Sequence, residues 1–115
     1  MLLDSGVLKV CALENTAPPG SMPAERLEPK SEHWYGERTV GYGRYFTAGQ
    51  ANERVDMLVR VWEDRSITTA DYCLLEDGTQ YRIVQVQQLL DEDELRVTDL
   101  SLERLGENYD LASDP

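Results

Sequence analysis

Hydrophobic and polar residues alternate along several short segments of the chain, and a period of two is typical of β-strands. The clearest segment is 53–62, whose apolar residues on one face are Val55, Met57, Val59 and Val61. Residues 6–13 form another apolar run, and residues 33–43 are rich in the aromatic and β-branched side chains that strands favour. The pattern therefore predicts a mainly β fold.

The dipeptide Asp77-Gly78 is the centre of the strongest hairpin signal in the chain. Residues 71–76 before it and 79–90 after it are rich in β-favouring side chains. Gly adopts a positive φ freely and Asp tolerates it, so the dipeptide predicts a two-residue type I′ turn.

A second hairpin follows, in which residues 95–102 run back along residues 79–90. Its acidic turn consists of Asp91, Glu92, Asp93 and Glu94. In each strand the apolar residues change face part-way along, after Ile83 in the first and after Val97 in the second. Two interpretations remain open: the strands contain β-bulges, or both of their faces are buried.

Residues 14–32 differ in kind because they contain most of the prolines. Proline has no N–H to donate and interrupts regular pairing, so we expect a long loop here. Such a loop either becomes ordered on docking with a partner or is flexible without one. The candidate partner-binding residues in this loop are Pro18, Pro19, Met22 and Pro23.

Thr47 with Gln50 three residues later is a capping-box pattern, which predicts one short helix. Residues 106–115 are acidic and lack apolar periodicity, so we expect a flexible tail. The rest, residues 1–105, is predicted to form one domain. We expect a small antiparallel β-barrel or sandwich of about six strands.

The charge balance is strongly acidic, with 22 acidic and 11 basic residues and a formal net charge of −11. Phosphate backbones are bound by clustered Lys and Arg, so we expect DNA to pass this surface without specific binding. No apolar run approaches the ~20 residues of a membrane span, and no leader pattern is present, so we expect no membrane contact. Cys11 and Cys73 are predicted to be buried, reduced thiols.

Candidate catalytic and metal-binding groups are few. His33 is the one histidine, and no Cys or His lies at metal-ligand spacing from another. The acidic turn lacks the glycine and the spaced oxygen ligands of a calcium loop. We expect no enzyme activity, no cofactor and no metal site.

Several aromatic residues occur in the first half of the chain: Trp34, Tyr35, Tyr42, Tyr45, Phe46 and Trp62. They either build the core or contact a partner, because Trp and Tyr are enriched in protein interfaces. We take Trp34, Tyr35 and the acidic turn Asp91–Glu94 as further candidate partner-binding residues.

The segment DGTQYRIVQVQQLLDEDELRVTDLSLERL, residues 77–105, resembles the head–tail joining (head-completion, or stopper) proteins of long-tailed bacteriophages and prophages. A strand of the form Gly-x-x-Tyr-x-Ile-x-x-Val is typical of that family. Its matches here are Gly78, Tyr81, Ile83 or Val84, and Val86. The segment GERTVGYGRYFTAGQANERVDMLVRV, residues 36–61, is similar to prophage-encoded members.

The resemblance implies a structural role in the virion, assembled in the bacterial host cytoplasm. Subunits of this family are monomers in isolation or form a six- or twelve-fold ring under the portal, close the DNA-filled capsid and dock the tail. The implied partners are portal or adaptor proteins and tail proteins. Two alternatives stay open: a tail-terminator or minor tail protein, and a cytoplasmic peptide- or ligand-binding β-barrel.

Overall fold

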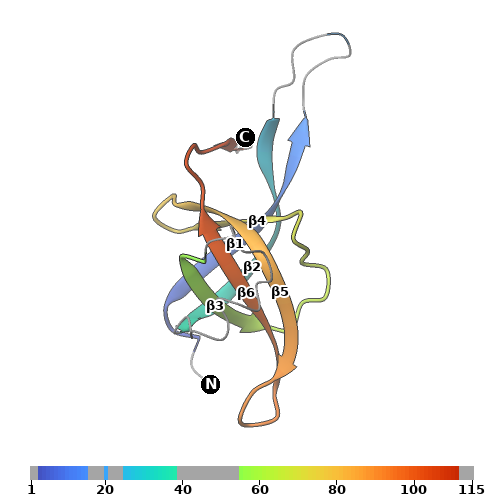
Figure 1. Ribbon diagram of the computed structural model, residues 1–115, viewed down its shortest axis with the longest axis vertical. Helices are drawn as coiled ribbons and strands as arrows, with labels where there is room; N and C mark the ends of the chain where they lie inside the picture. The colour runs from blue at the N-terminus through green and yellow to red at the C-terminus, as the bar shows by residue number, and fades with distance from the viewer. Residues whose placement is uncertain (1–2, 16–19, 21–24, 39–54, 112–115) are drawn as a thin grey trace.

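Seven β-strands make up the regular structure of the residues that the computed structural model describes, which are 3–15, 20, 25–38 and 55–111 (Figure 1). In chain order they are β1 (Gly6–Asn15), β2 (Glu25–Arg38), β3 (Met57–Trp62), β4 (Tyr72–Leu75), β5 (Gln80–Leu90), β6 (Arg96–Arg104) and β7 (Asp110–Leu111). The predicted mainly β class is confirmed. The helix predicted at Thr47–Gln50 lies outside the described residues.

Six of these strands form one antiparallel sheet whose pairings return to their starting point. The order β1-β4-β5-β6-β3-β2 is completed by a further pairing between β1 and β2. The three-stranded meander predicted for residues 71–102 is present as β4, β5 and β6. The seventh strand, β7, pairs with β2 in parallel.

The turn between β4 and β5 is a hairpin turn, but its type differs from the prediction. Gly78 donates its N–H to the Leu75 carbonyl (3.0 Å), and Leu75 donates to the Thr79 carbonyl (3.0 Å). Gly78 has a φ of 87°, whereas Asp77 is not among the described residues with positive φ. The loop therefore has three residues, and type I′ is wrong, because only its last position requires the left-handed region.

The turn between β5 and β6 has the same hydrogen-bond pattern. Glu94 donates its N–H to the Asp91 carbonyl (3.0 Å), and Asp91 donates to the Leu95 carbonyl (2.9 Å). Glu94 takes the position of Gly78 and has a φ of 62°, as the one described non-glycine residue with a positive φ. A residue with a side chain is strained there.

Each of the two explanations for the change of face applies to one strand of the second hairpin. β5 contains a register shift between Ile83 and Gln85 against β6, which is a β-bulge. β6 continues without a shift, but its residues from Val97 to Leu102 are buried on both faces.

The prediction of a loop over residues 14–32 is wrong at both of its described ends. β1 continues to Asn15, and β2 begins at Glu25. Pro29 is tolerated in β2 because the register shifts beside it: Val10 pairs with Ser31 and Cys11 with Pro29, which leaves Lys30 as the extra residue of a bulge. Residues 16–19 and 21–24, which include Pro18, Pro19, Met22 and Pro23, lie outside the described part of the chain.

Part of the predicted tail, residues 106–115, contacts the sheet. The Gln80 side chain donates to the Tyr109 carbonyl and accepts the Tyr109 N–H, both at 2.8 Å. The rings of Tyr72 and Tyr109 meet edge to face, with centroids 5.4 Å apart. Residues 109–111 therefore contact the sheet and reach β2 as β7, and the flexibility expected for residues 106–115 stays a prediction.

The core occupies one face of the alternating strands. Val59 and Val61 of β3 are fully buried among core residues of the other strands, as the alternation predicts. Ile67, in the connection from β3 to β4, also packs into this core. Cys11 and Cys73 are buried free thiols, and burial raises the pKa of both, which confirms the sequence expectation.

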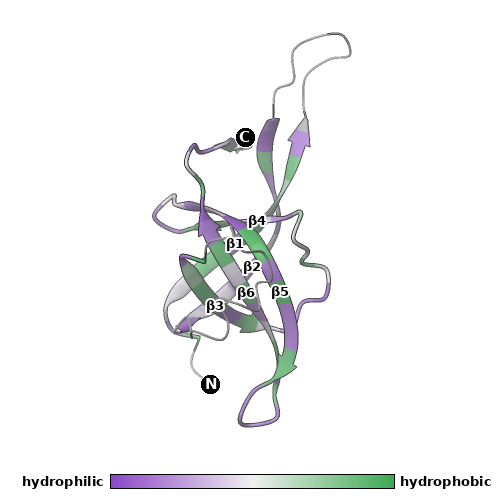
Figure 2. Cartoon of the chain, viewed as in Figure 1, coloured by the Kyte–Doolittle hydropathy of each residue, from purple (hydrophilic) through white to green (hydrophobic). Residues whose placement is uncertain are grey.

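Two hairpins project from opposite ends of the molecule, which measures 50 × 34 × 24 Å (Figure 1). The ends of β1 and β2 form one projection, and the β5–β6 hairpin forms the other. The end of β5 is hydrophobic and the turn after it is hydrophilic (Figure 2).

Candidate interaction surfaces

The acidic turn between β5 and β6 combines one structural acid with three exposed ones. Asp91 is buried, and its Oδ1 accepts the N–H groups of Leu95 and Asp93, both at 2.9 Å. The hydrogen bond from Leu95, together with that from Asp93, holds the pKa of Asp91 below its ordinary value. Glu92, Asp93 and Glu94 are exposed. Of the four predicted contact residues, these three are therefore accessible to a partner.

Exposed apolar and basic side chains surround the base of this turn. We call Trp62, Arg65, Leu90, Leu95 and Arg96 the hairpin patch. Its apolar members are 49%, 58% and 40% exposed, in the order Trp62, Leu90 and Leu95.

The strand register explains why these side chains gather. Trp62 pairs with Val97, and Leu90 pairs with Arg96, so β3, β6 and β5 all contribute at the same end of the sheet. Arg65 and Arg96 share one acid, Glu63, with nitrogen–oxygen distances of 3.3 Å and 4.0 Å. Sequence reasoning singled out Trp62 alone, although the leucines on either side of the acidic turn were visible in the sequence.

The projecting ends of β1 and β2 carry mainly acidic side chains, unlike the hairpin patch. We call residues 12–15 and 25–28 the arm. It carries three carboxylates and one guanidinium, which belong to Glu14, Glu25, Glu28 and Arg26. Glu14 and Glu25 are exposed. β7 pairs with the arm at Arg26 and Leu27, and so joins the arm to the C-terminal segment.

The two aromatic residues predicted to contact a partner lie on opposite faces of β2. Trp34 is exposed, whereas Tyr35 is buried in the core. The core interpretation of the aromatics therefore applies to Tyr35, and Trp34 is accessible to a partner. Tyr42, Tyr45 and Phe46 lie outside the described residues.

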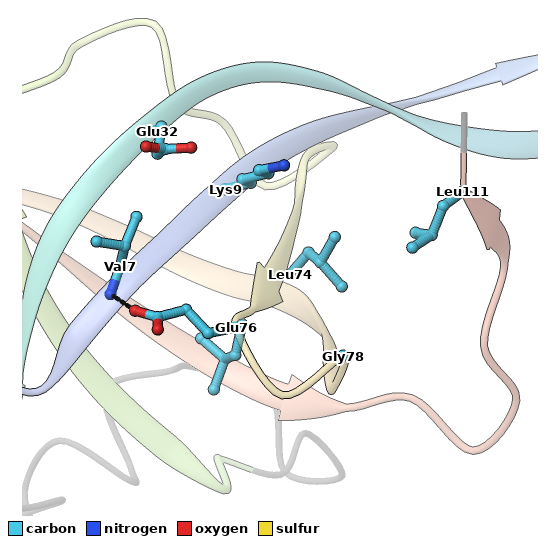
Figure 3. Close-up of a pocket in the computed structure, with 8 residues that line it drawn as sticks. Val7, Lys9, Glu32, Leu74, Glu76, Gly78 and Leu111 are labelled. Carbon is cyan, nitrogen blue, oxygen red and sulfur yellow. Dashed lines mark hydrogen bonds between the residues drawn. The ribbon is translucent and has the colours of Figure 1, made fainter. Parts of the chain in front are cut away.

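A cleft of about 350 Å³ opens between the outer side of β1 and β4 and the short strand β7 (Figure 3). Leu74 and Leu111 face the same space from β4 and β7, and Lys9 and Glu32 extend beside it. Glu76 accepts a hydrogen bond from the Val7 N–H at one end. The cleft could hold an apolar side chain of a peptide, with charged groups at its rim.

Ser31, His33 and Asp64 lie together, but their geometry differs from that of a catalytic triad. The His33 Nε2 atom is 3.0 Å from both the Ser31 hydroxyl and the Asp64 carboxylate. A triad needs serine on one ring nitrogen and the acid on the other. Burial acts to raise the pKa of Asp64, but hydrogen bonds from Ser66 and the contact with His33 hold it lower.

These contacts join the β3–β4 connection to β2. Lys30 adds a second attachment, with its Nζ 2.8 Å from Asp71 and 3.3 Å from the Ser66 carbonyl. The group containing His33 is therefore best explained as structural.

Arg60 and Asp99 form a buried ion pair across β3 and β6, with nitrogen–oxygen distances of 2.7 Å and 3.0 Å. The hydrogen bond from the guanidinium to Asp99 raises the pKa of Arg60 further. Within the described residues, no group of three or more His, Cys, Asp or Glu side chains is placed to hold a metal ion. No helix in that part of the chain is long and apolar enough to cross a membrane.

Comparison of the chain with models of known protein families gives no match, and no curated protein matches it.

Proposed function

We propose that the chain is a structural subunit of the head–tail connector of a tailed bacteriophage or prophage. In this role it forms a ring under the portal, closes the DNA-filled capsid and docks the tail, after assembly in the host cytoplasm. The proposal treats the closed circuit of six antiparallel pairings as a small β-barrel. It also rests on the resemblance of residues 77–105 to head–tail joining proteins.

The observation that supports the proposal is the presence of two different exposed surfaces at opposite ends of one small domain. A connector subunit must contact neighbours and partners on more than one side at once. The ends of β1 and β2, which form the arm, and the β5–β6 hairpin, which contributes Leu90, Leu95 and Arg96 to the hairpin patch, project from opposite ends of the body (Figure 1). Exposed Trp, Arg and Leu side chains at one of these ends are suited to a protein interface.

The charge of the chain supports the same role. A net charge of −11 gives a negative surface. DNA moving through a channel with such a wall is repelled by it and does not adhere. The proposal therefore includes DNA passage without specific binding.

Electron microscopy of the purified chain mixed with portal-bearing, DNA-filled capsids tests this function. We expect a new ring of density under the portal, with the DNA retained. A ring or cap on purified tails would favour the alternative of a tail-terminator or minor tail protein. Binding to neither particle would overturn the proposal.

The predicted contact loop is tested in the same experiment. Replacement of residues 17–23 with glycine and serine leaves β1 and β2 complete, because these strands end at Asn15 and begin at Glu25. We expect the variant to fold, as measured by circular dichroism, and to fail to complete capsids. Normal ring density with this variant would remove Pro18, Pro19, Met22 and Pro23 from the contact residues.

The cleft beside Leu74 and Leu111 favours a second candidate function, which is peptide binding by a free-standing domain. Its lining combines apolar side chains with Lys9, Glu32 and Glu76. Saturable binding from a random peptide library, lost in Leu74→Asp and unaffected in Glu107→Lys, would support this function. Absence of binding by the folded chain would reject it.

A further inference from the structure

We propose that the surface covered by residues 109–111 is a binding site for an extended peptide of a partner protein, and that this segment fills the site until such a peptide displaces it. The peptide has the chemistry of the segment itself, which is an aromatic residue, an acidic residue and a leucine in succession. The inference goes beyond the proposed function, because it requires neither a ring nor a capsid. The site also differs from the cleft beside Leu74, which Leu111 only borders.

Gln80 binds the main chain of the segment at one residue. Its buried side-chain amide donates to the Tyr109 carbonyl and accepts the Tyr109 N–H, both at 2.8 Å. An amide that pairs with both backbone groups of one residue takes the place of a neighbouring strand. This contact therefore recognises an extended main chain, and it accepts any residue that has an N–H.

The edge of β2 continues this recognition. β7 pairs with it in parallel at two positions, Arg26 with Asp110 and Leu27 with Leu111. Main-chain pairing at a sheet edge is a general way to bind an extended peptide. The Arg26 Nε atom is buried and has no hydrogen-bond partner among the described residues, so the site contains a donor suited to a carboxylate of the peptide.

The side chains of Tyr109 and Leu111 indicate what the site selects. The Tyr109 ring meets the Tyr72 ring edge to face, with centroids 5.4 Å apart. Leu111 pairs with Leu27, which is 1% exposed. A sheet-edge site gains its specificity from alternate residues of the added strand. We therefore expect selection of an aromatic residue followed two positions later by an aliphatic one.

Few contacts hold the segment in place. Its ladder with β2 has two residue pairs, and Leu111 remains 46% exposed. The preceding residues Gly106, Glu107 and Asn108 are exposed. Segments with so little burial open locally at a small free-energy cost. Because the segment is tethered to the domain, it still competes strongly with a free peptide, through its high effective concentration.

Competition with a synthetic peptide tests the site. The peptide is a fluorescent copy of residues 105–111, LGENYDL. We expect the full chain with Tyr109→Ala and Leu111→Ala to bind it at least tenfold more tightly than the unaltered chain, whose site is filled, as measured by fluorescence anisotropy. Circular dichroism checks that this variant folds. Equal affinity of the two chains, or no binding by the folded variant, would overturn the proposal.

A further change in that variant shows where the peptide binds. Gln80→Met keeps the side-chain length and removes both hydrogen bonds to the peptide, so we expect affinity to fall at least tenfold. Gln87→Met alters an exposed glutamine of the same strand and should leave affinity unchanged. Unchanged binding in Gln80→Met would place the peptide elsewhere and overturn the proposal.

A change in the peptide cannot unfold the protein and tests the same site independently. A peptide with alanine in place of its tyrosine loses the ring contact with Tyr72, and we expect at least tenfold weaker binding. Equal binding of the two peptides would contradict the assigned selection. Loss of binding in Leu74→Asp but not in Gln80→Met would assign the peptide to the cleft and overturn the proposal.

This inference and the connector function can fail separately. Peptide binding by a chain that joins neither capsids nor tails would support the site and reject the connector function. Ring density under the portal, together with no peptide binding, would reject the site and leave the connector function in place.

Discussion

At the scale of single residues, Glu94 and Gly78 occupy equivalent positions in two hairpins, yet one of them carries a side chain. Glu94 has a φ of 62°, which costs roughly 1 kcal/mol for a residue with a Cβ. We expect Glu94→Gly to raise the free energy of unfolding by about 0.5–1 kcal/mol, as measured by urea denaturation. The gain is smaller than the full strain because glycine also loses more entropy on folding.

Gly78→Ala is the reverse of Glu94→Gly, because it adds a Cβ at the equivalent position of the other hairpin. A Cβ at Gly78 would have no atom within 4 Å, so backbone strain alone should lower stability, by about 1 kcal/mol. Glu92→Gly, at a position without positive φ, should not stabilise the protein. If Glu92→Gly and Glu94→Gly had equal effects, the left-handed conformation would not be the cause.

The lowered pKa of Asp91, in the same turn, predicts that the stability of the protein depends on pH. Its pKa in the folded state is lowered by hydrogen bonds from Leu95 and Asp93. The stability it contributes is therefore complete well above the unfolded pKa of about 3.9 and is lost as pH falls through the folded pKa. We expect the loss of stability in Asp91→Asn to be greatest above about pH 5 and to shrink below about pH 4. Urea denaturation across this range measures it, with Glu92→Gln as the charge control; a loss independent of pH would contradict the prediction.

At the scale of elements, Gln80 attaches the C-terminal segment to the sheet. Its buried amide makes two hydrogen bonds to the backbone of Tyr109. Gln80→Met keeps the length of the side chain and removes both bonds. We expect a loss of about 1 kcal/mol in stability and faster amide exchange at residues 109–111.

Truncation after Asn108 shows whether Gln80 acts through the tail. In the truncated chain Tyr109 is gone, so Gln80→Met should cost little beyond the truncation itself. An equal cost in the full and truncated chains would mean that Gln80 stabilises the sheet directly.

The sequence predicted those strands and turns that depend on neighbouring residues, and it missed those that depend on contacts between residues far apart in the chain. The alternation in residues 53–62 and the turn residues around Gly78 and Glu94 correctly indicated β3 and the β4–β5–β6 meander. The start of β2 was missed because Pro29 interrupts pairing in general, and the bulge at Lys30 that accommodates it depends on the register with β1. The contacts of the tail with the sheet could not be predicted because Gln80 lies 29 residues from Tyr109.

The candidate surfaces were predictable to a similar extent. The exposure of Glu92, Asp93 and Glu94 follows from their place in a hairpin turn. The hairpin patch could not be predicted, because Arg65 and Arg96 are brought together by the pairing of β3 with β6. Most of the arm, residues 14–15 and 25–28, lies within the segment that the sequence analysis interpreted as a loop.

At the scale of the whole molecule, the net charge predicts how the chain responds to salt. The formal net charge is −11, so copies of the chain repel one another at low salt. The screening length falls from about 10 Å at 0.1 M salt to about 3 Å at 1 M, which removes most of that repulsion. We therefore expect sedimentation velocity to show stronger self-association at high salt than at low salt. Arg65→Glu with Arg96→Glu makes the chain more acidic and should increase this dependence on salt. Weaker association of the unaltered chain at high salt would mean that attraction between unlike charges, rather than apolar contact, joins the copies.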